Sequence, residues 1–400
     1  MNILLIGAGS NRNLAINTFL ENEDKLFIVD NVNSNYLKFA HEFSTVSDFR
    51  NYNEVYRVSL DLAIRNNIDA IITFSDPCLL VVGELSQQLR IPNLTPKCAA
   101  IAHNKDLMRE EFLKAGLDIP LFKVINNEKE LKSGLEVIKF PAIIKPSNRA
   151  GSIGVSKVNN LDESIIGFRN AWDGRLLGKG VVLLEEFIEG DEISVESVTK
   201  NGKTHIVAIT KKIVSESGYF YEIGHCLPYD QYTDAQLVKE VVAKALQTIN
   251  FTHGIAHSEL IVTKEGVKII EVNGRAAGDY IIDLIYYAKG LNMYQLLRDL
   301  YLDSEDLDGK YFSNVNNKYA AIQFFETPPG YLKEVKIPET DLEKKNIKDF
   351  SLYFTENEYL PPITSSIGRR GHVIATSESL DEVESTVEEI VQKLLFILEE

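Results

Sequence analysis

The chain has 400 residues, more than one typical domain, and this length predicts two or three domains with sizeable apolar cores. An apolar fraction of 44% and a charged fraction of 25% are ordinary for a globular protein. The formal net charge of −16 disfavours nucleic acid and anionic membranes as partners, so an anionic ligand would need a local basic pocket.

Short apolar runs alternate with helical patterns over residues 1–95. This alternation predicts a parallel, doubly wound sheet, because parallel strands need crossover helices between them. The expected strands and helix starts are residues 3–6, 26–29 and 70–73, and Asn13, Asn53 and Leu79.

A glycine-rich turn, Gly7-Ala8-Gly9-Ser10-Asn11-Arg12, follows the first expected strand, and Asp30 ends the second. This arrangement is similar to a dinucleotide-binding turn, but Arg12 stands where the third glycine of G-x-G-x-x-G belongs. That glycine permits close packing of the helix. A plain tight turn is therefore favoured, and NAD(P) binding stays an alternative.

A lysine before a glycine-rich loop follows in the middle of the chain. After an expected helix over residues 105–115, a strand over 140–146 carries Lys145 near its end. In the loop that comes next, Gly151 and Gly154 would let backbone N–H groups approach phosphate oxygens. The alternative is a surface turn with a solvated lysine.

Three further strands are expected, and an acidic stretch, E-E-F-I-E-G-D-E over residues 185–192, joins the first two. Backbone groups at such a turn can hydrogen-bond a purine, and Glu192 could reach ribose hydroxyls; the alternative is an acidic surface turn. Asn201-Gly202 predicts a hairpin turn. The strands are residues 181–184, 192–199 and 204–211.

An antiparallel hairpin is expected where two apolar runs flank the turn Lys264-Glu265-Gly266. Glu259 begins its first strand, while Glu271 and Asn273 end the second, so two carboxylates and an amide meet at one end. Mg²⁺ prefers such oxygen ligands. The alternative is a hairpin with solvated acidic ends.

The remaining pattern is mixed α and β, and it ends in an expected amphipathic helix over residues 381–399. We divide the chain into an N-terminal domain (1–95), a central domain (96–305, with a smaller subdomain over about 120–190) and a C-terminal α+β region (306–400). The other elements expected from helical and apolar patterns are helices over residues 162–172, 235–249, 280–288 and 294–301, and strands over 319–325 and 372–376.

Three cysteines, odd in number and widely spaced, show neither a disulfide framework nor metal-ligand pairing. They predict buried or incidental thiols in a reducing compartment. No basic leader and no long apolar stretch precede or follow the first strand, so we expect no signal peptide and no membrane span. A cytoplasmic protein is the expectation.

The order of these features resembles the ATP-grasp superfamily. The resemblance covers about the first three hundred residues, and it implies that ATP lies between two α+β subdomains behind an N-terminal sheet domain. Mg²⁺ would be bound by Glu259, Glu271 and Asn273. The nucleotide would be bound by Lys105 and Lys145 at the phosphates, the loop with Gly151, Ser152, Ile153 and Gly154 above them, Glu185, Glu186, Phe187 and Ile188 near adenine, and Glu192 at the ribose.

A second match resembles the carboxylate–amine branch, the L-amino-acid ligases. The segment F-x-E-x-G-H-x-x-P runs from Phe220 to Pro228, and R-x-x-G from Arg275 to Gly278. In this resemblance Glu222 neutralises a substrate ammonium, His225 contacts the product carboxylate and Arg275 holds the reacting carboxylate, with Gly278 in the same site. Ala276-Ala277 replaces a bulkier residue, which leaves the pocket size open.

The resemblance implies a ligase that activates a carboxylate as an acyl phosphate, with Arg275, Lys145 and Glu271 as catalytic residues. It implies ATP and two Mg²⁺ ions, with Mn²⁺ as a substitute, and small amino-acid-like carboxylates and amines as partners. A homodimer is one outcome it allows. The alternatives are a purine-type ligase, a bicarbonate- or formate-using carboxylase, and an NAD-binding protein.

Overall fold

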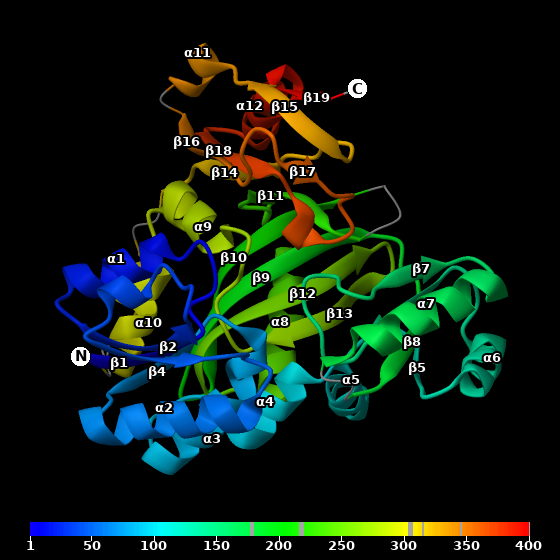
Figure 1. Cartoon of the computed structure of the whole chain (residues 1–400). Helices are drawn as coiled ribbons and strands as arrows, with labels where there is room; N and C mark the ends of the chain where they lie inside the picture. The colour runs from blue at the N-terminus through cyan, green and yellow to red at the C-terminus, as the bar shows by residue number, and fades with distance from the viewer. Residues whose placement is uncertain (177–179, 216–219, 303–306, 314–315, 345, 400) are drawn as a thin grey trace.

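The computed structural model describes residues 1–176, 180–215, 220–302, 307–313, 316–344 and 346–399. Within these ranges the strands form four sheets. Figure 1 shows an N-terminal α/β layer on one side of a long central sheet, a small sheet with two helices on the other side, and the C-terminal strands above. The predicted combination of a parallel α/β domain with α+β regions is confirmed.

The N-terminal sheet is parallel, has the order β3-β2-β1-β4, and carries helices on both faces. Alternate side chains of β1 point to opposite faces, so Ile3 packs with α1 while Leu4 packs with α2 and α3. Strand β3 lies at the sheet edge and lacks a buried apolar run, so the sequence pattern does not reveal it. The elements are β1 (Asn2–Ile6), α1 (Asn13–Glu21), β2 (Lys25–Asn31), η1 (Leu37–Phe39), β3 (Glu42–Val46), α2 (Tyr52–Asn66), β4 (Ala70–Thr73), η2 (Asp76–Cys78) and α3 (Leu79–Leu89).

Two helices lead to the small antiparallel sheet, whose order is β5-β8-β6-β7. Helices α6 and α7 cover one face, and each begins with an Asn-x-x-Glu capping box, at Asn127 and Asn160. The elements are α4 (Pro96–His103), α5 (Lys105–Lys114), β5 (Phe122–Ile125), α6 (Glu128–Val137), β6 (Ala142–Pro146), β7 (Ser156–Val158), α7 (Leu161–Gly174) and β8 (Val182–Glu186).

The long sheet is antiparallel and has the order β13-β12-β9-β10-β11-β14-β18-β16. On β9, Glu192, Ser194 and Glu196 alternate with Ile193 and Val195, which are buried in the core that α8 covers. The other face of these strands is therefore free to carry polar groups. The elements are β9 (Asp191–Lys200), β10 (Lys203–Val214), β11 (Glu222–Leu227), α8 (Ala235–Thr248), β12 (His253–Thr263), β13 (Gly266–Asn273), α9 (Ile281–Lys289), α10 (Met293–Tyr301) and η4 (Asp308–Phe312).

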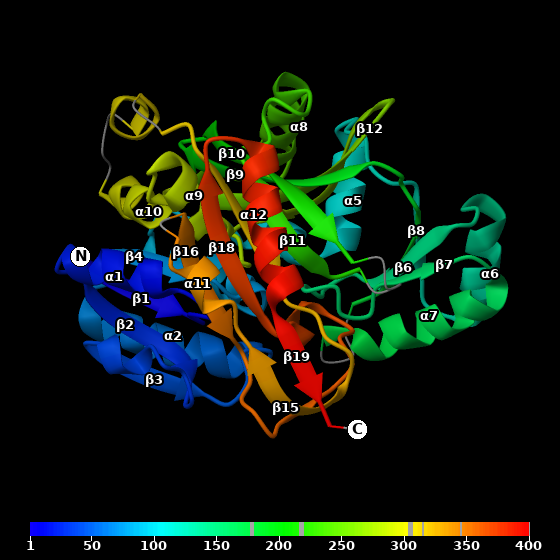
Figure 2. The ribbon, with the colours of Figure 1, turned by 90° about the horizontal axis from the view of Figure 1, so that it is seen from above.

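The C-terminal region continues the long sheet through β14, β18 and β16, and α12 packs on these strands. The predicted helix over 381–399 is wrong over residues 394–399, because α12 ends at Lys393. The apolar run after it forms β19, which pairs with β15, and Figure 2 shows these two strands side by side beyond α12. The elements are β14 (Tyr319–Phe324), β15 (Gly330–Lys336), α11 (Glu339–Leu342), β16 (Ile347–Leu352), β17 (Tyr359–Leu360), η5 (Ser366–Gly368), β18 (Gly371–Ser377), α12 (Leu380–Lys393) and β19 (Leu395–Leu398).

The predicted state of the cysteines is confirmed, since Cys78, Cys98 and Cys226 are buried and free. In the part of the chain that the structure describes, no helix is both long enough and apolar enough to cross a bilayer.

Candidate active site

A cleft lies between the small sheet and the polar face of the long sheet, with about 930 Å³ of space, solvent at its mouth included. Most of the predicted site residues line it: Lys105, Lys145, Gly151, Ser152, Glu185, Glu186, Phe187, Ile188, Glu192, Glu222, Glu259 and Glu271. Ile153 and Asn273 line an adjoining hollow, and Arg275 and Gly278 line a separate cavity. Gly154 and His225 line none of these three spaces.

The small-sheet wall of the cleft carries a buried charge cluster. Lys145 Nζ lies 2.6 Å from Glu185 Oε2, and Arg109 Nε lies 2.9 Å from Glu185 Oε1. Burial would raise the pKa of Glu185, but Arg109 and Lys145 together lower it to about 2. Burial lowers the pKa of Lys145 despite the Glu185 carboxylate. Two cations against one carboxylate leave this wall positive.

The loop after β6 is tied to the long sheet through Lys105 at the start of α5. Lys105 Nζ donates to the Arg149 carbonyl and to Glu271 Oε1, both at 2.8 Å. A predicted phosphate ligand and a predicted metal ligand thus contact each other. Gly151 has φ +68° and open space where a Cβ would stand, whereas a Cβ on Gly154 would lie 3.3 Å from Pro146. Gly151 therefore suits close approach of a ligand, and Gly154 suits packing against α7.

Apolar and aromatic side chains line the end of the cleft near β8, where the predicted adenine site lies. Phe187 and Ile188 stand there with Ile143, Val214 and Ile270. The Phe187 ring has Lys157 Nζ 3.6 Å from its centroid. A planar base fits such a slot, because stacking and apolar contact need no fixed hydrogen-bond pattern.

The predicted metal ligands lie on neighbouring strands. Glu259 stands opposite Glu271, and His257 stands opposite Asn273, in the register of β12 and β13. Glu259 and Glu271 both line the cleft, and Asn273 adjoins it. Among the described residues, no group of three His, Cys, Asp or Glu side chains is arranged to hold a metal by itself. The donor set fits Mg²⁺, which binds through one or two carboxylates together with phosphate oxygens.

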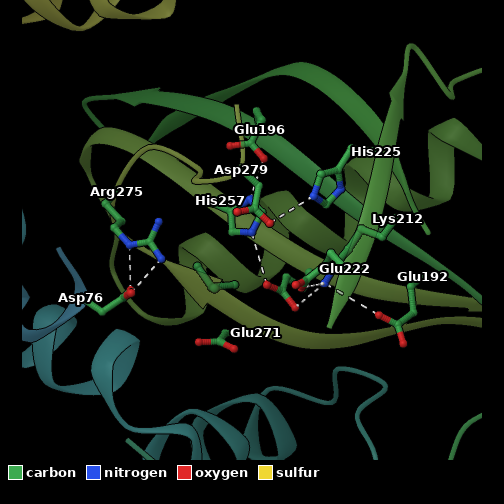
Figure 3. A network of polar contacts seen from close by, with 12 residues as sticks. Asp76, Glu192, Glu196, Lys212, Glu222, His225, His257, Glu271, Arg275 and Asp279 are labelled. Atoms are coloured by element: carbon green, nitrogen blue, oxygen red, sulfur yellow. Dashed lines mark hydrogen bonds and ion pairs between the residues drawn. The ribbon is translucent and has the colours of Figure 1, made fainter. Parts of the chain in front are cut away.

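A network of buried charges covers the polar face of the long sheet (Figure 3). Glu196 Oε1 lies 2.6 Å from His257 Nδ1, and His257 Nε2 lies 3.3 Å from Glu259. Burial would lower the pKa of His257, but Glu196 and Glu259 raise it to about 10. The two carboxylates therefore favour the protonated form of the imidazole.

Lys212 on β10 continues this network toward the predicted substrate residues. Its Nζ lies 3.0 Å from Glu259, 3.3 Å from Glu222 and 3.7 Å from Glu192. Burial opposes the charge of Lys212, yet the three carboxylates hold its pKa well above the usual value. Burial also raises the pKa of Glu192. Lys212 thus connects the predicted ribose, metal and ammonium sites.

Arg275, the predicted carboxylate-binding residue, is held in a fixed orientation by Asp76 of the N-terminal domain. Its Nε and Nη2 donate to the two Asp76 oxygens at 2.7 and 2.8 Å, and Nη1 donates to the Ala276 carbonyl. Figure 3 shows this pair beside Glu271. Asp76 also lines the hollow that contains Lys105 and Glu271. The ion pair therefore holds a rigid cation between this hollow and the separate cavity that Arg275 lines.

His225 is buried and points to Asp279, with Nε2 3.4 Å from Oδ2 (Figure 3). Arg369 donates to both Asp279 oxygens, at 2.8 and 2.6 Å. Burial opposes ionisation of Asp279, but Arg369 and His225 hold its pKa well below the usual range. Asp279 and Tyr280 have φ of 52° and 61°, a costly conformation for such residues that occurs often at functional sites.

Several charged residues of the site are not found from the sequence: Arg109, Glu196, Lys212, His257, Asp76, Asp279 and Arg369. Strand alternation is the one available signal, since Glu192 and Glu196 share a face of β9 and His257 and Glu259 share a face of β12. Asp76 and Arg369 come from distant segments and have no such signal.

Two segments of the chain match known protein families. Residues 138–283 match the ATP-grasp domain family, and residues 323–399 match the family described as L-amino acid ligase C-terminal domain 2. The chain therefore contains an ATP-grasp domain followed by an L-amino acid ligase C-terminal domain. The family resemblance that we draw from the sequence is confirmed, as is the class of ADP-forming, C–N-bond-forming enzymes.

Individual relatives are distant. The chain is 24% identical to a phosphoribosylamine–glycine ligase of Methanocaldococcus jannaschii, over 97% of this chain and 93% of that protein. It is 26% identical to the alanine–anticapsin ligase of Bacillus subtilis, over 72% of this chain and 65% of that protein. The fold is similar to the crystal structure of an L-amino acid ligase from Bacillus licheniformis, with a TM-score of 0.85, 18% identity and coverage of 100% and 99%.

Proposed function

We propose that this ATP-grasp enzyme joins the carboxylate of one amino-acid-like substrate to the amine of another, with release of ADP and phosphate. One observation carries the proposal: a single cleft contains the cationic wall of Lys145, the facing carboxylates Glu259 and Glu271, and Glu222, and Arg275 is bound to Asp76 of the adjoining hollow. The match of residues 323–399 to an L-amino acid ligase domain supports amino acids as substrates.

In this proposal Lys105 and Lys145 contact the ATP phosphates, and the loop around Gly151 and Ser152 covers them. Glu259, Glu271 and Asn273 would hold two Mg²⁺ ions, for which Mn²⁺ would substitute. Bound divalent ions supply charge neutralisation of the phosphate oxygens. The excess positive charge around Glu185 also favours phosphoryl transfer, because fixed cations stabilise the negative charge that develops during this step.

The reaction has two steps. Arg275 holds the reacting carboxylate, one of whose oxygens attacks the γ-phosphorus, so that an O–P bond to ADP breaks and an acyl phosphate forms. The amine of the second substrate then attacks the acyl carbon, a C–N bond forms, phosphate leaves and the amine loses a proton. Because Asp76 fixes Arg275, the guanidinium is preorganised to bind the oxyanion of this second step.

Glu222 receives the ammonium group of a substrate in this proposal. Its carboxylate contacts Lys212, at 3.3 Å, and the Ser366 hydroxyl, at 2.7 Å, so it is held between the long sheet and the C-terminal region. His225 is buried and contacts Asp279. This position supports a role for His225 in orienting Asp279, and it argues against the predicted direct contact with the product carboxylate. We also propose a cytoplasmic location, supported by the three free buried thiols.

The test is a screen of amino-acid pairs with ATP and Mg²⁺, read by ADP release and by mass spectrometry of the products. Bicarbonate, formate and phosphoribosylamine with glycine serve as further arms, the last because a phosphoribosylamine–glycine ligase matches 97% of the chain. We expect turnover with amino-acid pairs, and loss of ADP release in Glu271→Ala and Lys145→Ala with the fold retained. Turnover confined to the other arms contradicts the proposal, and saturable NADH binding without ATP affinity contradicts the nucleotide site.

A further inference from the structure

A second cavity lies where the N-terminal glycine-rich turn, the segment after β13 and the C-terminal loop before β18 meet, with about 1230 Å³ of space, solvent at its mouth included. Its charged lining residues are Arg12, Arg275, Arg369 and Asp279. We call it the arginine cavity. Three cations against one carboxylate form a positive site in a protein whose net charge is −16.

The arginine cavity adjoins the active cleft. Ser366 lines the cavity and donates its hydroxyl to Glu222, which lines the cleft, at 2.7 Å. Arg275 lines the cavity and is bound to Asp76, which lines the hollow that contains Glu271. A substrate held by Glu222 or Arg275 can therefore extend into this space.

The three arginines differ in how their charge is balanced. Arg369 forms a two-bond ion pair with Asp279, and Arg275 forms one with Asp76. Arg12 donates only to neutral groups, from Nη1 to the Ala277 carbonyl at 2.7 Å and to the Tyr294 hydroxyl at 2.9 Å. No described carboxylate forms an ion pair with Arg12, although its charge lowers the pKa of Asp283 against a larger effect of burial.

Arg12 also has donors without acceptors. The side chain is only 6% exposed, its Nε is buried with no hydrogen-bond partner, and Nη2 makes no hydrogen bond within the described ranges. Nε is too deeply buried to reach a ligand, but Nη2 keeps its hydrogen-bonding capacity unused and can donate to an oxyanion in the cavity.

The turn before Arg12 presents backbone donors to the same cavity. Gly9, Ser10 and Asn11 line it, and their N–H groups have no partner among the residues that the structure describes. Gly9 and Asn11 have φ of +72° and +57°, the alternation that turns successive N–H groups toward one point. Helix α1 begins here, and no side chain caps its first turn.

We propose that the arginine cavity binds a second substrate carboxylate, one that does not react, through Arg12 and the N–H groups of residues 9–11. The inference rests on the proposed ligase function. The carboxylate has two sources: the α-carboxylate of the amine-supplying amino acid, or the side chain of an acidic amino acid. Either source makes the glycine-rich turn a substrate-binding element, where the sequence favours a plain tight turn and leaves dinucleotide binding as an alternative.

The test measures binding by isothermal titration calorimetry with Mg²⁺ and a non-hydrolysable ATP analogue present. Glutamate against glutamine probes a side-chain carboxylate, and methionine against methioninamide probes an α-carboxylate. We expect the acid of one pair to bind at least about 10-fold more tightly than its amide, since charged hydrogen bonds are the stronger ones. Arg12→Gln should bring acid and amide within about threefold of each other.

Two further variants separate binding from folding. Ser10→Asp places a carboxylate on the exposed turn, leaves the contacts of Arg12 in place, and should also remove the preference for the acid. Arg65→Gln is the matched control, because Arg65 is an exposed, ion-paired arginine of the same domain and does not line the cavity. It should retain the preference.

ADP release in the same samples distinguishes the two proposals. Acid-selective binding that depends on Arg12, without ADP release for any pair, supports the carboxylate site and contradicts the ligase function. ADP release with no acid preference in either pair, or with a preference that survives in both Arg12→Gln and Ser10→Asp, overturns the carboxylate site and leaves the ligase function standing. Failure of every carboxylate probe to bind also overturns it.

Discussion

The buried carboxylate of Glu185 allows a quantitative test of the charge cluster in the cleft. Glu185→Gln removes the negative charge between Lys145 and Arg109 and keeps the size of the side chain. Both cations then remain buried without a counter-charge. Removing one partner from a buried ion pair typically costs about 3–5 kcal/mol.

The magnitude also follows from the titration of Glu185. Burial opposes its ionisation, but Arg109 and Lys145 lower its pKa from 4.5 to about 2, which corresponds to about 3 kcal/mol of stabilisation. Because the folded-state pKa lies below the unfolded one, this stabilisation is complete above the unfolded pKa and is lost as the pH falls through the folded one. We expect Glu185→Gln to lower the free energy of unfolding by about 3 kcal/mol at pH 7.5, and by less at pH 3.5.

Urea unfolding followed by tryptophan fluorescence measures this change in the free energy of unfolding for the small sheet. Trp172 is the one tryptophan of the chain, and it packs on the core of the small sheet that holds Glu185. Glu186→Gln is the control, since its carboxylate is more exposed and lies 3.5 Å from Lys268; it should cost less than about 1 kcal/mol. Equal transitions for the two variants, or a Glu185→Gln transition within about 1 kcal/mol of wild type, would refute the reasoning.

Three other changes have definite expected outcomes. Lys212→Met removes the ammonium that Glu192, Glu222 and Glu259 share, and ADP release should fall at least about 100-fold; an unchanged rate would contradict a role for this network. Asp283→Asn should raise the melting temperature at pH 7.5 but not at pH 3.5, because burial raises the Asp283 pKa to about 6 and the folded state therefore disfavours its ionised form above that pH. Gly190→Ala places a Cβ 2.3 Å from the Val262 carbonyl oxygen, so its melting temperature should fall; an unchanged value would contradict the close approach.

Local patterns predict the part of the site that lies within single elements. The β12–β13 hairpin follows from two apolar runs around a glycine turn, whereas a bulge between Glu259 and Leu260, which the sequence does not reveal, brings Glu259 opposite Glu271. Lys145 follows from its place between a buried strand and a glycine loop. Each of these inferences depends on contacts between residues close in the sequence.

The unpredicted residues belong to contacts between distant segments. Asp76 and Arg275 are 199 positions apart, and Asp279 and Arg369 are 90 apart, so no periodicity connects the partners. The terminal strand β19 is missed for the same reason. The helical pattern of α12 continues into its residues, and only the pairing with the distant strand β15 marks them as a strand. Arg12 is recognised in the sequence only as a departure from the dinucleotide-binding motif. The fold, however, places it in a cavity beside the active cleft.

The two walls of the cleft differ in charge, and this difference bears on metal dependence. On the long sheet, the ion pairs that Glu192, Glu196, Glu222 and Glu259 form within the described part of the chain involve two cations, His257 and Lys212. A triphosphate that enters between this acidic wall and Lys145 meets attraction on one side and repulsion on the other. The proposed divalent ions at Glu259 and Glu271 resolve the conflict, since they neutralise the acidic side where the phosphates approach it. We therefore expect nucleotide affinity to fall strongly when Mg²⁺ is removed, although the cationic wall itself is unchanged. Nucleotide titrations with and without EDTA measure this loss of affinity.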